Sequence, residues 1–188
     1  MSGRRQPSLN LPSPAEYALL RPWRSEDATD LLLMRRDPLN EHYAGRLLQG
    51  RGEALARMSE WGAGWQDGTA ASWAIVAADG QQLLGMVTFG LVQADLLTGS
   101  VGYELMPQAR GRGLATAAVR AATSIVFQRL GWHRIELYHA VENDRSCAVA
   151  RRAGYLFEGV MRSAMRYPVD GRYSDEHLHA RIATDEQP

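Results

Sequence analysis

The chain contains no lysine, so all 21 of its basic residues are arginines, and 21 acidic residues balance them to a formal net charge of zero. A neutral chain lacks the general electrostatic attraction to phosphate backbones that nucleic-acid-binding domains show. We therefore expect no nucleic-acid partner. The missing lysine also excludes the phosphate loop G-x-x-x-x-G-K-[ST], whose lysine contacts the phosphates.

Cysteine is scarce as well, because Cys147 is the only one in the chain. A single cysteine excludes an intramolecular disulfide and a cysteine-rich metal site. His133 and His139 have no metal-ligand spacing with carboxylates, so we expect no metal. Cys147 is typical of a small buried helix residue, and a nucleophilic role is the weaker reading of it.

Long hydrophobic runs are missing too, since no window approaches the ~18 apolar residues of a transmembrane helix. Arg4 and Arg5 are not followed by an apolar run, so we expect neither a signal peptide nor a membrane partner. An apolar content of 45% with 22% charged residues is ordinary for a globular chain, and the expected location is cytoplasmic. The sequence leaves a homodimer open.

At 188 residues the chain predicts one domain. Residues 1–15 carry three prolines and few bulky apolar groups, which predicts a disordered tail before a domain over residues 16–184. Hydrophobic patterns predict strands over 17–23, 71–92 (a hairpin around Asp79-Gly80), 99–107, 133–141, 155–167 and 173–182, and helices over 25–36, 53–65, 113–130 and 145–154. This order predicts an α/β fold with one mixed sheet flanked by helices.

The turn Arg110-Gly111-Arg112-Gly113 lies between a strand that ends at Pro107 and an alanine-rich helix. The first N–H groups of a helix have no internal partner and carry partial positive charge. Glycine lets them approach a phosphate without interference from a Cβ atom, and arginine adds charge-assisted donors. The turn therefore favours an anion site, although a tight turn alone explains such glycines about as often.

Three motifs in order along the chain resemble the GNAT N-acetyltransferase superfamily. Gln108, Gly111 and Gly113 follow "GYELMP" and form Q-x-x-G-x-G/A, which is similar to the acyl-CoA pyrophosphate signature of that superfamily. The segment "ENDRSCAVARRAGYLFEG" (142–159) resembles its N-x-x-S…helix…GY-x-x-x-G segment. The ending "VDGRYSDEHLHARI" (169–182) resembles the RimJ/RimL-type branch, which acetylates the N-terminal amines of ribosomal proteins.

This resemblance implies the GNAT fold, a mixed sheet whose two central parallel strands splay apart with acetyl-CoA between them. Asn143 would lie near the pantetheine amides. Ser146 would lie at the thioester sulfur and act as a catalytic residue by hydrogen-bonding or protonating it. The other residues expected to bind acyl-CoA are Leu105 and Met106 at the pantetheine, and Gln108, Arg110, Gly111, Arg112, Gly113, Leu114 and Ala115 at the pyrophosphate.

The implied reaction is direct attack of an amine on the thioester carbonyl, without a covalent enzyme intermediate. Glu104, on the splayed strand, is the residue we select as the second catalytic group, a base acting through water. Asp175, His177 or water alone remain alternatives. Met165 stands where the RimL pattern carries a glutamate, so the choice of base stays open.

The expected function is transfer of an acyl group, most simply acetyl, to a primary amine, foremost a protein N-terminal α-amine of ribosomal-protein type. An α-amine with a pKa of ~7.7–8.0 costs below ~1 kcal/mol to deprotonate near neutral pH, whereas a lysine-type amine at ~10.4 costs about 4 kcal/mol. A small-molecule amine, such as an antibiotic or a polyamine, is an alternative acceptor. A non-catalytic acyl-CoA sensor is the third reading.

Overall fold

A computed structural model describes residues 4–43, 48–167 and 170–186, so residues 1–3 of the expected tail and Val169 of the third motif lie outside the described residues. The strands are β1 (Leu9–Asn10), β2 (Ala18–Arg21), β3 (Ala70–Ala77), β4 (Leu83–Gln93), β5 (Thr98–Leu105), β6 (Arg134–Ala140), β7 (Leu156–Arg166) and β8 (Tyr173–Ile182). The α-helices are α1 (Ala28–Arg35), α2 (Pro38–Tyr43), α3 (Arg51–Asp67), α4 (Leu114–Leu130) and α5 (Asp144–Arg152).

The eight strands form one sheet in the order β1-β2-β3-β4-β5-β6-β8-β7. All neighbouring pairs in it are antiparallel except β5 and β6, which run parallel. This confirms the predicted mixed sheet flanked by helices. Within the described residues, no helix combines the length and the apolar character needed to cross a membrane.

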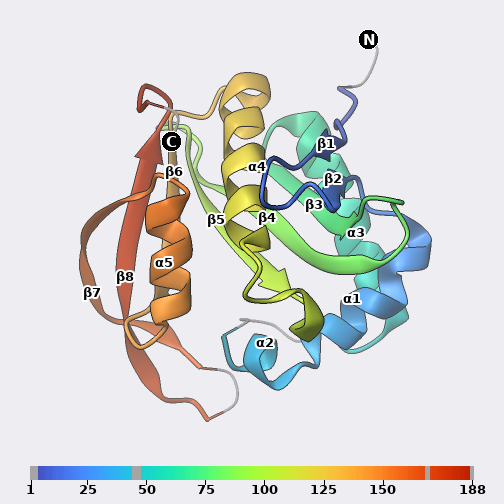
Figure 1. Cartoon of the computed structure of the whole chain (residues 1–188). Coiled ribbons are helices and arrows are strands. Elements are labelled where there is room, and N and C mark those ends of the chain that lie inside the picture. The colour runs from blue at the N-terminus through green and yellow to red at the C-terminus, as the bar shows by residue number, and fades with distance from the viewer. Residues whose placement is uncertain (1–3, 44–47, 168–169, 187–188) are drawn as a thin grey trace.

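Helices cover both faces of the sheet, and alternate residues of β4 show which core lies on which face. Val87 packs in the cluster that contains the buried residues of α4, whereas its neighbour Met86 packs with Leu31 of α1 and Trp61 of α3. Successive strand residues point to opposite faces, so α4 lies on one side and α1 and α3 on the other. Figure 1 shows α4 and α5 together in front of the sheet.

The segment before residue 16 differs from the expected disordered tail. Leu9–Asn10 pair with Leu19 and Leu20 of β2. Leu11 and Ala15 are buried in the same core cluster as α4. The composition gave no sign of this packing, because two apolar side chains among prolines show no strand periodicity.

The start of the first helix also differs from the prediction. Ser25 does not cap it, because its hydroxyl contacts Glu26. The buried Asp27 accepts the Arg24 N–H at 2.8 Å and the Arg21 guanidinium through both carboxylate oxygens, at 2.7 and 2.8 Å. This two-point bond compensates the burial of both charges and ties the helix start to β2.

Pro38 ends α1 as predicted, but it also begins the short helix α2, which the sequence analysis missed. Asp37 precedes Pro38 and accepts the Asn40 N–H at 3.2 Å, as an N-cap residue does. Proline is favoured at the first position of a helix, because its missing N–H has no partner there anyway. The Asp-Pro pair was therefore the available signal for α2.

The parallel pairing of β5 and β6 is short. Thr98, Gly99 and Ser100 pair with Arg134, Ile135 and Glu136, and no pairing with β6 is found along the rest of β5. The two strands separate beyond Ser100, and the glycine turn and α4 follow the free end of β5. The end of β6 leads into α5. The sheet is therefore open at its centre, as the resemblance implied.

Gly99 lies in the parallel segment of β5 and β6, and we predict that Gly99→Ala destabilises the fold. A Cβ atom there would overlap the Trp132 ring and lie 2.8 Å from the Gly90 carbonyl oxygen. Overpacking of this kind costs about 1–3 kcal/mol of unfolding free energy. Urea denaturation of the variant measures the loss.

The matched control is Gly90→Ala in the neighbouring strand, where a Cβ atom would meet nothing within 4 Å. This variant should keep the wild-type stability or gain slightly, because alanine has less freedom than glycine in the unfolded chain. Equal stabilities of the two variants would contradict the packing argument.

Candidate active site

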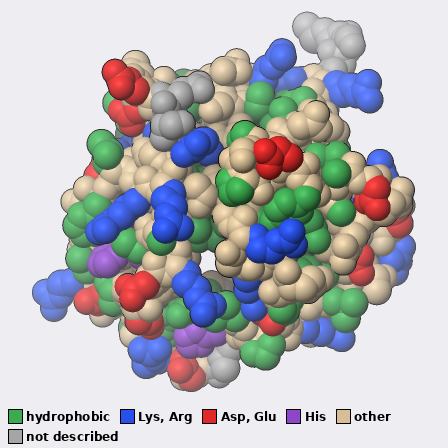
Figure 2. Space-filling model, in the orientation of Figure 1, with side chains coloured by type: hydrophobic (Ala, Val, Ile, Leu, Met, Phe, Trp, Pro, Cys, Tyr) green, Lys and Arg blue, Asp and Glu red, His purple; other side chains and the backbone are tan. Residues whose placement is uncertain are grey.

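A cleft of about 1170 Å³ occupies the gap between the separated ends of β5 and β6. Tyr103, Leu114 and Ser146 line it on the face of α4 and α5, and Tyr43 and Glu104 line it on the face of α1 and α2. Tyr103 and Glu104 are neighbours in a strand, so their side chains enter the cleft from opposite faces of the sheet. Figure 2 shows a hollow near the centre of the α4 and α5 face.

The N-terminus of α4 opens onto this cleft. Gly111 and Gly113 have φ values of 74° and 75°, a left-handed conformation that favours glycine. No side chain caps the helix, and Ala117 donates its N–H to the Gly113 carbonyl. The preceding N–H groups of Leu114 and Ala115 therefore have no acceptor within the helix, and both residues line the cleft.

Arg110 lines the cleft, but its guanidinium turns toward α2. It bonds to the Asp37 carboxylate, to the Asn40 side-chain oxygen at 3.2 Å and to the Leu105 carbonyl at 3.0 Å. Although burial opposes the shift, the Arg110 guanidinium lowers the pKa of Asp37. Arg110 thus holds α2 against the end of β5. Its guanidinium points away from the glycine turn, where it was expected to bind an anion.

Three further residues expected at acyl-CoA lie outside the cleft lining. The Arg112 guanidinium lies 4.0 Å from the centre of the Tyr17 ring. Gln108 is exposed on the surface. The Met106 side chain packs against the hydrophobic clusters that contain Val87 and Met86. Its N–H donates to the Leu84 carbonyl at 2.9 Å.

Leu105 lines the cleft at the free edge of β5. Its carbonyl accepts bonds from Asn40 at 3.2 Å and from Arg110 at 3.0 Å. Because successive N–H groups of a strand point in opposite directions and that of Met106 faces β4, the Leu105 N–H faces the cleft. It is therefore the backbone donor that this end of β5 offers to a ligand.

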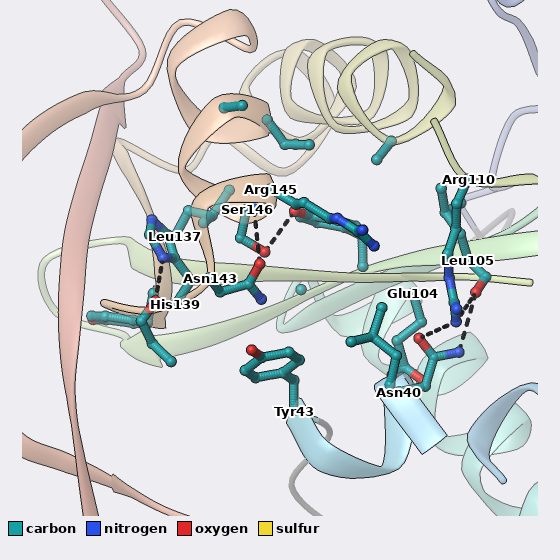
Figure 3. Close-up of a pocket in the computed structure, with 18 of the residues that line it drawn as sticks. Asn40, Tyr43, Glu104, Leu105, Arg110, Leu137, His139, Asn143, Arg145 and Ser146 are labelled. Carbon is teal, nitrogen blue, oxygen red and sulfur yellow. Dashed lines mark hydrogen bonds between the residues drawn. The ribbon is translucent and has the colours of Figure 1, made fainter. Parts of the chain in front are cut away.

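Asn143 and Ser146 meet at the start of α5 (Figure 3). The Asn143 side-chain oxygen accepts the Ser146 N–H at 3.1 Å and caps the helix. The Tyr103 hydroxyl donates to the Ser146 hydroxyl at 2.9 Å across the cleft. Burial raises the pKa of Tyr103 to about 12, so this phenol keeps its proton at neutral pH.

Glu104 approaches the cleft from the opposite face (Figure 3). Its Oε1 lies 3.1 Å from the Arg35 guanidinium, and its buried Oε2 has no hydrogen-bond partner among the described residues. Burial raises the pKa of Glu104 to about 7, and Arg35 opposes the rise. A carboxyl group with this pKa exchanges protons near neutral pH.

Two more glutamates line the cleft on the side of Glu104. Glu142 accepts hydrogen bonds from the hydroxyl groups of Tyr167 at 2.9 Å and Ser174 at 3.1 Å. The hydrogen bond from its own backbone N–H and those from these two hydroxyls lower the pKa of Glu142. Burial raises the pKa of Glu176. Met165 also lines the cleft, so Glu142 and Glu176 place carboxylates in the same cleft from positions other than the one where the family pattern has a glutamate.

The rings of α2 partly close this side of the cleft. His42 stacks on Tyr167 with centroids 4.6 Å apart, and Tyr43 meets the same ring edge-on at 6.2 Å. Tyr167 follows β7 directly, so α2 reaches across the gap from the end of β5 to β7. The helix that the sequence analysis missed thus supplies a wall of the cleft.

The other candidates for the base, Asp175 and His177, are not among the residues that line the cleft. Asp175 accepts the Ser163 N–H at 2.8 Å. His177 lies in a group with His139, His179 and Cys147 on the α5 face of β6 and β8. This group differs from the expectation of no metal site, because these four side chains come from three separate elements and only the fold brings them together.

Several residues of the cleft escaped the sequence analysis. Arg145 and Arg152 of α5 line it, although their pattern is that of a solvated helix face. Tyr103 precedes Glu104 in β5 and was not among the residues expected at the site. Asn40 and Tyr43 belong to α2, whose Asp-Pro start was their available signal.

Comparison with known proteins identifies the family. Residues 18–156 match the family described as "Acetyltransferase (GNAT) domain". The chain is 31% identical over 114 residues to "Probable N-acetyltransferase YjcK" of Bacillus subtilis, which covers 60% of this chain and 62% of that protein. It is 29% identical over 101 residues to "Ribosomal-protein-serine acetyltransferase" of Escherichia coli, which covers 54% of this chain and 55% of that protein. The chain thus spans less than two thirds of the length of either relative.

Among solved structures, Mycobacterium smegmatis RimJ in complex with CoA-disulfide superimposes with a TM-score of 0.77 and 26% identity, covering 94% of this chain and 86% of that one. The similar structures thus include a CoA complex. The matched domain and the shared fold, with its open centre and its glycine turn before α4, show that this chain belongs to the GNAT N-acetyltransferase family, in which its relatives include acetyltransferases of the RimJ/RimL type.

Proposed function

We propose that this chain acetylates the N-terminal α-amine of a protein, of ribosomal-protein type, by direct attack of the amine on acetyl-CoA. One observation carries the proposal. The Glu104 carboxylate and the bonded hydroxyls of Tyr103 and Ser146 line one cleft from opposite faces of the sheet. A base and a group that stabilises the leaving thiolate are what direct transfer requires.

The residues of the α4 and α5 face fit an acyl-CoA molecule. The uncapped N–H groups of Leu114 and Ala115 suit the pyrophosphate, and the Leu105 N–H suits a pantetheine amide. Arg145 and Arg152 line the same cleft, and Figure 2 shows basic side chains around its mouth. The volume exceeds the roughly 300–1,000 Å³ of common small-ligand sites, as a long nucleotide ligand requires.

Ser146 is the group that we place at the thioester sulfur. The Tyr103 hydroxyl is the donor in their mutual bond, so the Ser146 hydroxyl keeps its own proton for another acceptor. Acetyl-CoA supplies the activated thioester, and its sulfur gains negative charge as the carbon–sulfur bond breaks. A serine proton held by a second hydroxyl stabilises that charge.

The pKa of Glu104 favours an α-amine as the acceptor. A carboxyl group with a pKa of about 7 takes a proton from an α-ammonium group of pKa ~7.7–8.0 at a cost of about 1 kcal/mol. The same transfer from a lysine-type ammonium group at ~10.4 costs roughly 5 kcal/mol. Glu104 is therefore matched to an N-terminal amine.

The charge on the Glu104 side favours a cationic acceptor. Glu142 and Glu176 line this part of the cleft together with the Tyr43 ring. A carboxylate pairs with an incoming ammonium group, and an aromatic face attracts it further. The same three carboxylates favour a polyamine as a second candidate acceptor, because such a molecule carries several ammonium groups.

The acceptor is tested by measuring CoA release with N-terminal peptides of ribosomal proteins, with the same peptides blocked at the N-terminus, with polyamines and with aminoglycosides. We expect release with the free peptides and none with the blocked ones. Turnover of polyamines alone would support the second candidate. If the protein binds acetyl-CoA but releases no CoA with any amine, this result would favour the third reading, a non-catalytic acyl-CoA sensor.

We predict that Glu104→Gln lowers kcat for the preferred amine by at least about 10²-fold, because the base is lost. The wild-type kcat should rise as the pH increases through about 7, where Glu104 loses its proton, and the variant should lack this rise. Steady-state kinetics between about pH 5.5 and 8.5 measures both effects. An unchanged profile would remove Glu104 as the base.

The same variant has a stability signature. Burial raises the folded-state pKa of Glu104 from 4.5 to about 7, so its contribution to stability is complete below 4.5 and is lost as the pH rises through 7. Relative to Glu104→Gln, the wild type should therefore lose on the order of 3 kcal/mol across this interval. Urea denaturation of both proteins across this pH interval measures the loss.

Arg152 and Arg151 provide a matched pair for acyl-CoA binding. Both are exposed on α5, but only Arg152 is among the residues that line the cleft. We predict that Arg152→Gln raises the KM for acetyl-CoA roughly 3- to 10-fold by removing a phosphate donor, with little change in kcat. Arg151→Gln should keep the wild-type KM, and equal effects of the two variants would argue against a cleft contact.

A further inference from the structure

Three histidines and the only cysteine meet beside the active-site cleft. His139 belongs to β6, His177 and His179 to β8, and Cys147 to α5. His139 and His177 are directly opposite in the antiparallel register, and His179 lies two residues further on the same face. One ligand atom from each of the four side chains can be chosen so that all lie within 4.8 Å of one another.

The hydrogen bonds of the cluster leave nitrogen lone pairs without partners. His139 is 5% exposed, and its Nδ1 lies 2.9 Å from the Ala140 carbonyl. A carbonyl only accepts, so Nδ1 carries the proton and Nε2 presents a lone pair, the arrangement that metal-bound histidines use. The His139 Nε2 is buried without a hydrogen-bond partner among the described residues.

His177 and His179 also have unpartnered ring nitrogens, but at Nδ1 and not at Nε2. His179 is fully buried, and neither its Nδ1 nor the Nδ1 of His177 has a hydrogen-bond partner within the described chain. The His179 Nε2 lies 3.9 Å from the Cys147 sulfur. Buried polar atoms are rarely left without a partner, so unpartnered ring nitrogens on three histidines of one cluster are what a missing ligand would explain.

The electrostatic surroundings keep the imidazoles available as ligands. Burial lowers the pKa of both His139 and His179. On α5, the Asp144 carboxylate raises the pKa of His139, whereas the Arg151 guanidinium lowers the pKa of His179. The Phe157 ring lies 5.2 and 5.4 Å from the rings of His177 and His179 and partly shields them from water.

We propose that His139, Cys147, His177 and His179 form a tetrahedral binding site for one Zn²⁺ ion. Zinc bonds of ~2.0–2.1 Å to nitrogen and ~2.3 Å to sulfur place tetrahedral ligand atoms roughly 3.3–3.6 Å apart. The four side chains need to contract by about 1 Å from their present spread to reach this geometry. Three imidazoles and a thiolate suit Zn²⁺ better than the oxygen-seeking Mg²⁺ or Ca²⁺.

Zinc at this site would join α5 to β6 and β8. Cys147 follows Ser146 directly, and His139 itself lines the cleft (Figure 3). A metal held by both would fix the start of α5, where Asn143 and Ser146 are presented. The site is thus structural in kind, and it does not depend on the identity of the amine acceptor.

The test uses the full chain without a histidine tag, stripped with a chelator and then titrated with Co²⁺ and Zn²⁺. We expect one equivalent of Co²⁺ to give the intense visible bands of tetrahedral coordination and a near-ultraviolet thiolate-to-cobalt band. Cys147 is the only thiol in the chain, so it is the only source of that band. One equivalent of Zn²⁺ should abolish both signals with a Kd below about 1 µM and raise the Tm.

Variants separate the cluster from other histidines. Cys147→Ser should lose the thiolate band, and both Cys147→Ser and His179→Gln should weaken Zn²⁺ binding more than about 10-fold. His133→Gln, at an exposed histidine outside the cluster, should bind as the wild type does. Absence of tetrahedral Co²⁺ bands in the folded wild type would overturn the proposal, even where a variant fails to fold. Zinc binding that survives Cys147→Ser and His179→Gln unchanged would overturn it too.

Discussion

The fold depends on the early end of the parallel pairing between β5 and β6. Backbone N–H and C=O groups that lose a strand partner inside a domain need other partners. Beyond Ser100, the structure provides some of these from outside the sheet. Asn40 and Arg110 donate to the Leu105 carbonyl, while the Leu105 N–H still faces the cleft. The open centre of the sheet therefore leaves backbone groups without strand partners, and it is the place where a ligand can pair with them.

Arginine holds elements together both at this opening and elsewhere in the described chain. Arg110 fastens α2 to the end of β5, Arg35 of α1 pairs with Glu104, and Arg21 ties the start of the first helix to β2. A guanidinium group makes several directional bonds at once, which an ammonium group cannot do with the same geometry. The balanced charge of the chain thus reflects internal pairing as well as surface solvation.

The sequence predicted the elements whose signals are local. The helix start at Gly113 was found because glycine acts on its own neighbours in the chain. The glycine turn was also placed correctly at the cleft. Its arginines were assigned to a ligand, yet they turned to Asp37 and Tyr17, because the direction of a long side chain depends on partners distant in sequence.

The remainder could not be found by reading along the chain. The four histidine and cysteine side chains come from β6, α5 and β8, and only the antiparallel register brings them together. Glu142 and Glu176 converge beside Met165 in the same way. The packing of Leu11 in the core gave no periodic signal, because one buried side chain sets no period.

Since the cleft is reached from both faces of the sheet, its two halves are built from different parts of the chain. One half consists of the glycine turn, α4 and α5, and the other of α1, α2 and the ends of β7 and β8. Substitutions in α2 or after β7 can then reshape the second half while the first stays intact. A scaffold divided in this way allows acceptor preference to diverge among descendants of one gene while the donor stays the same.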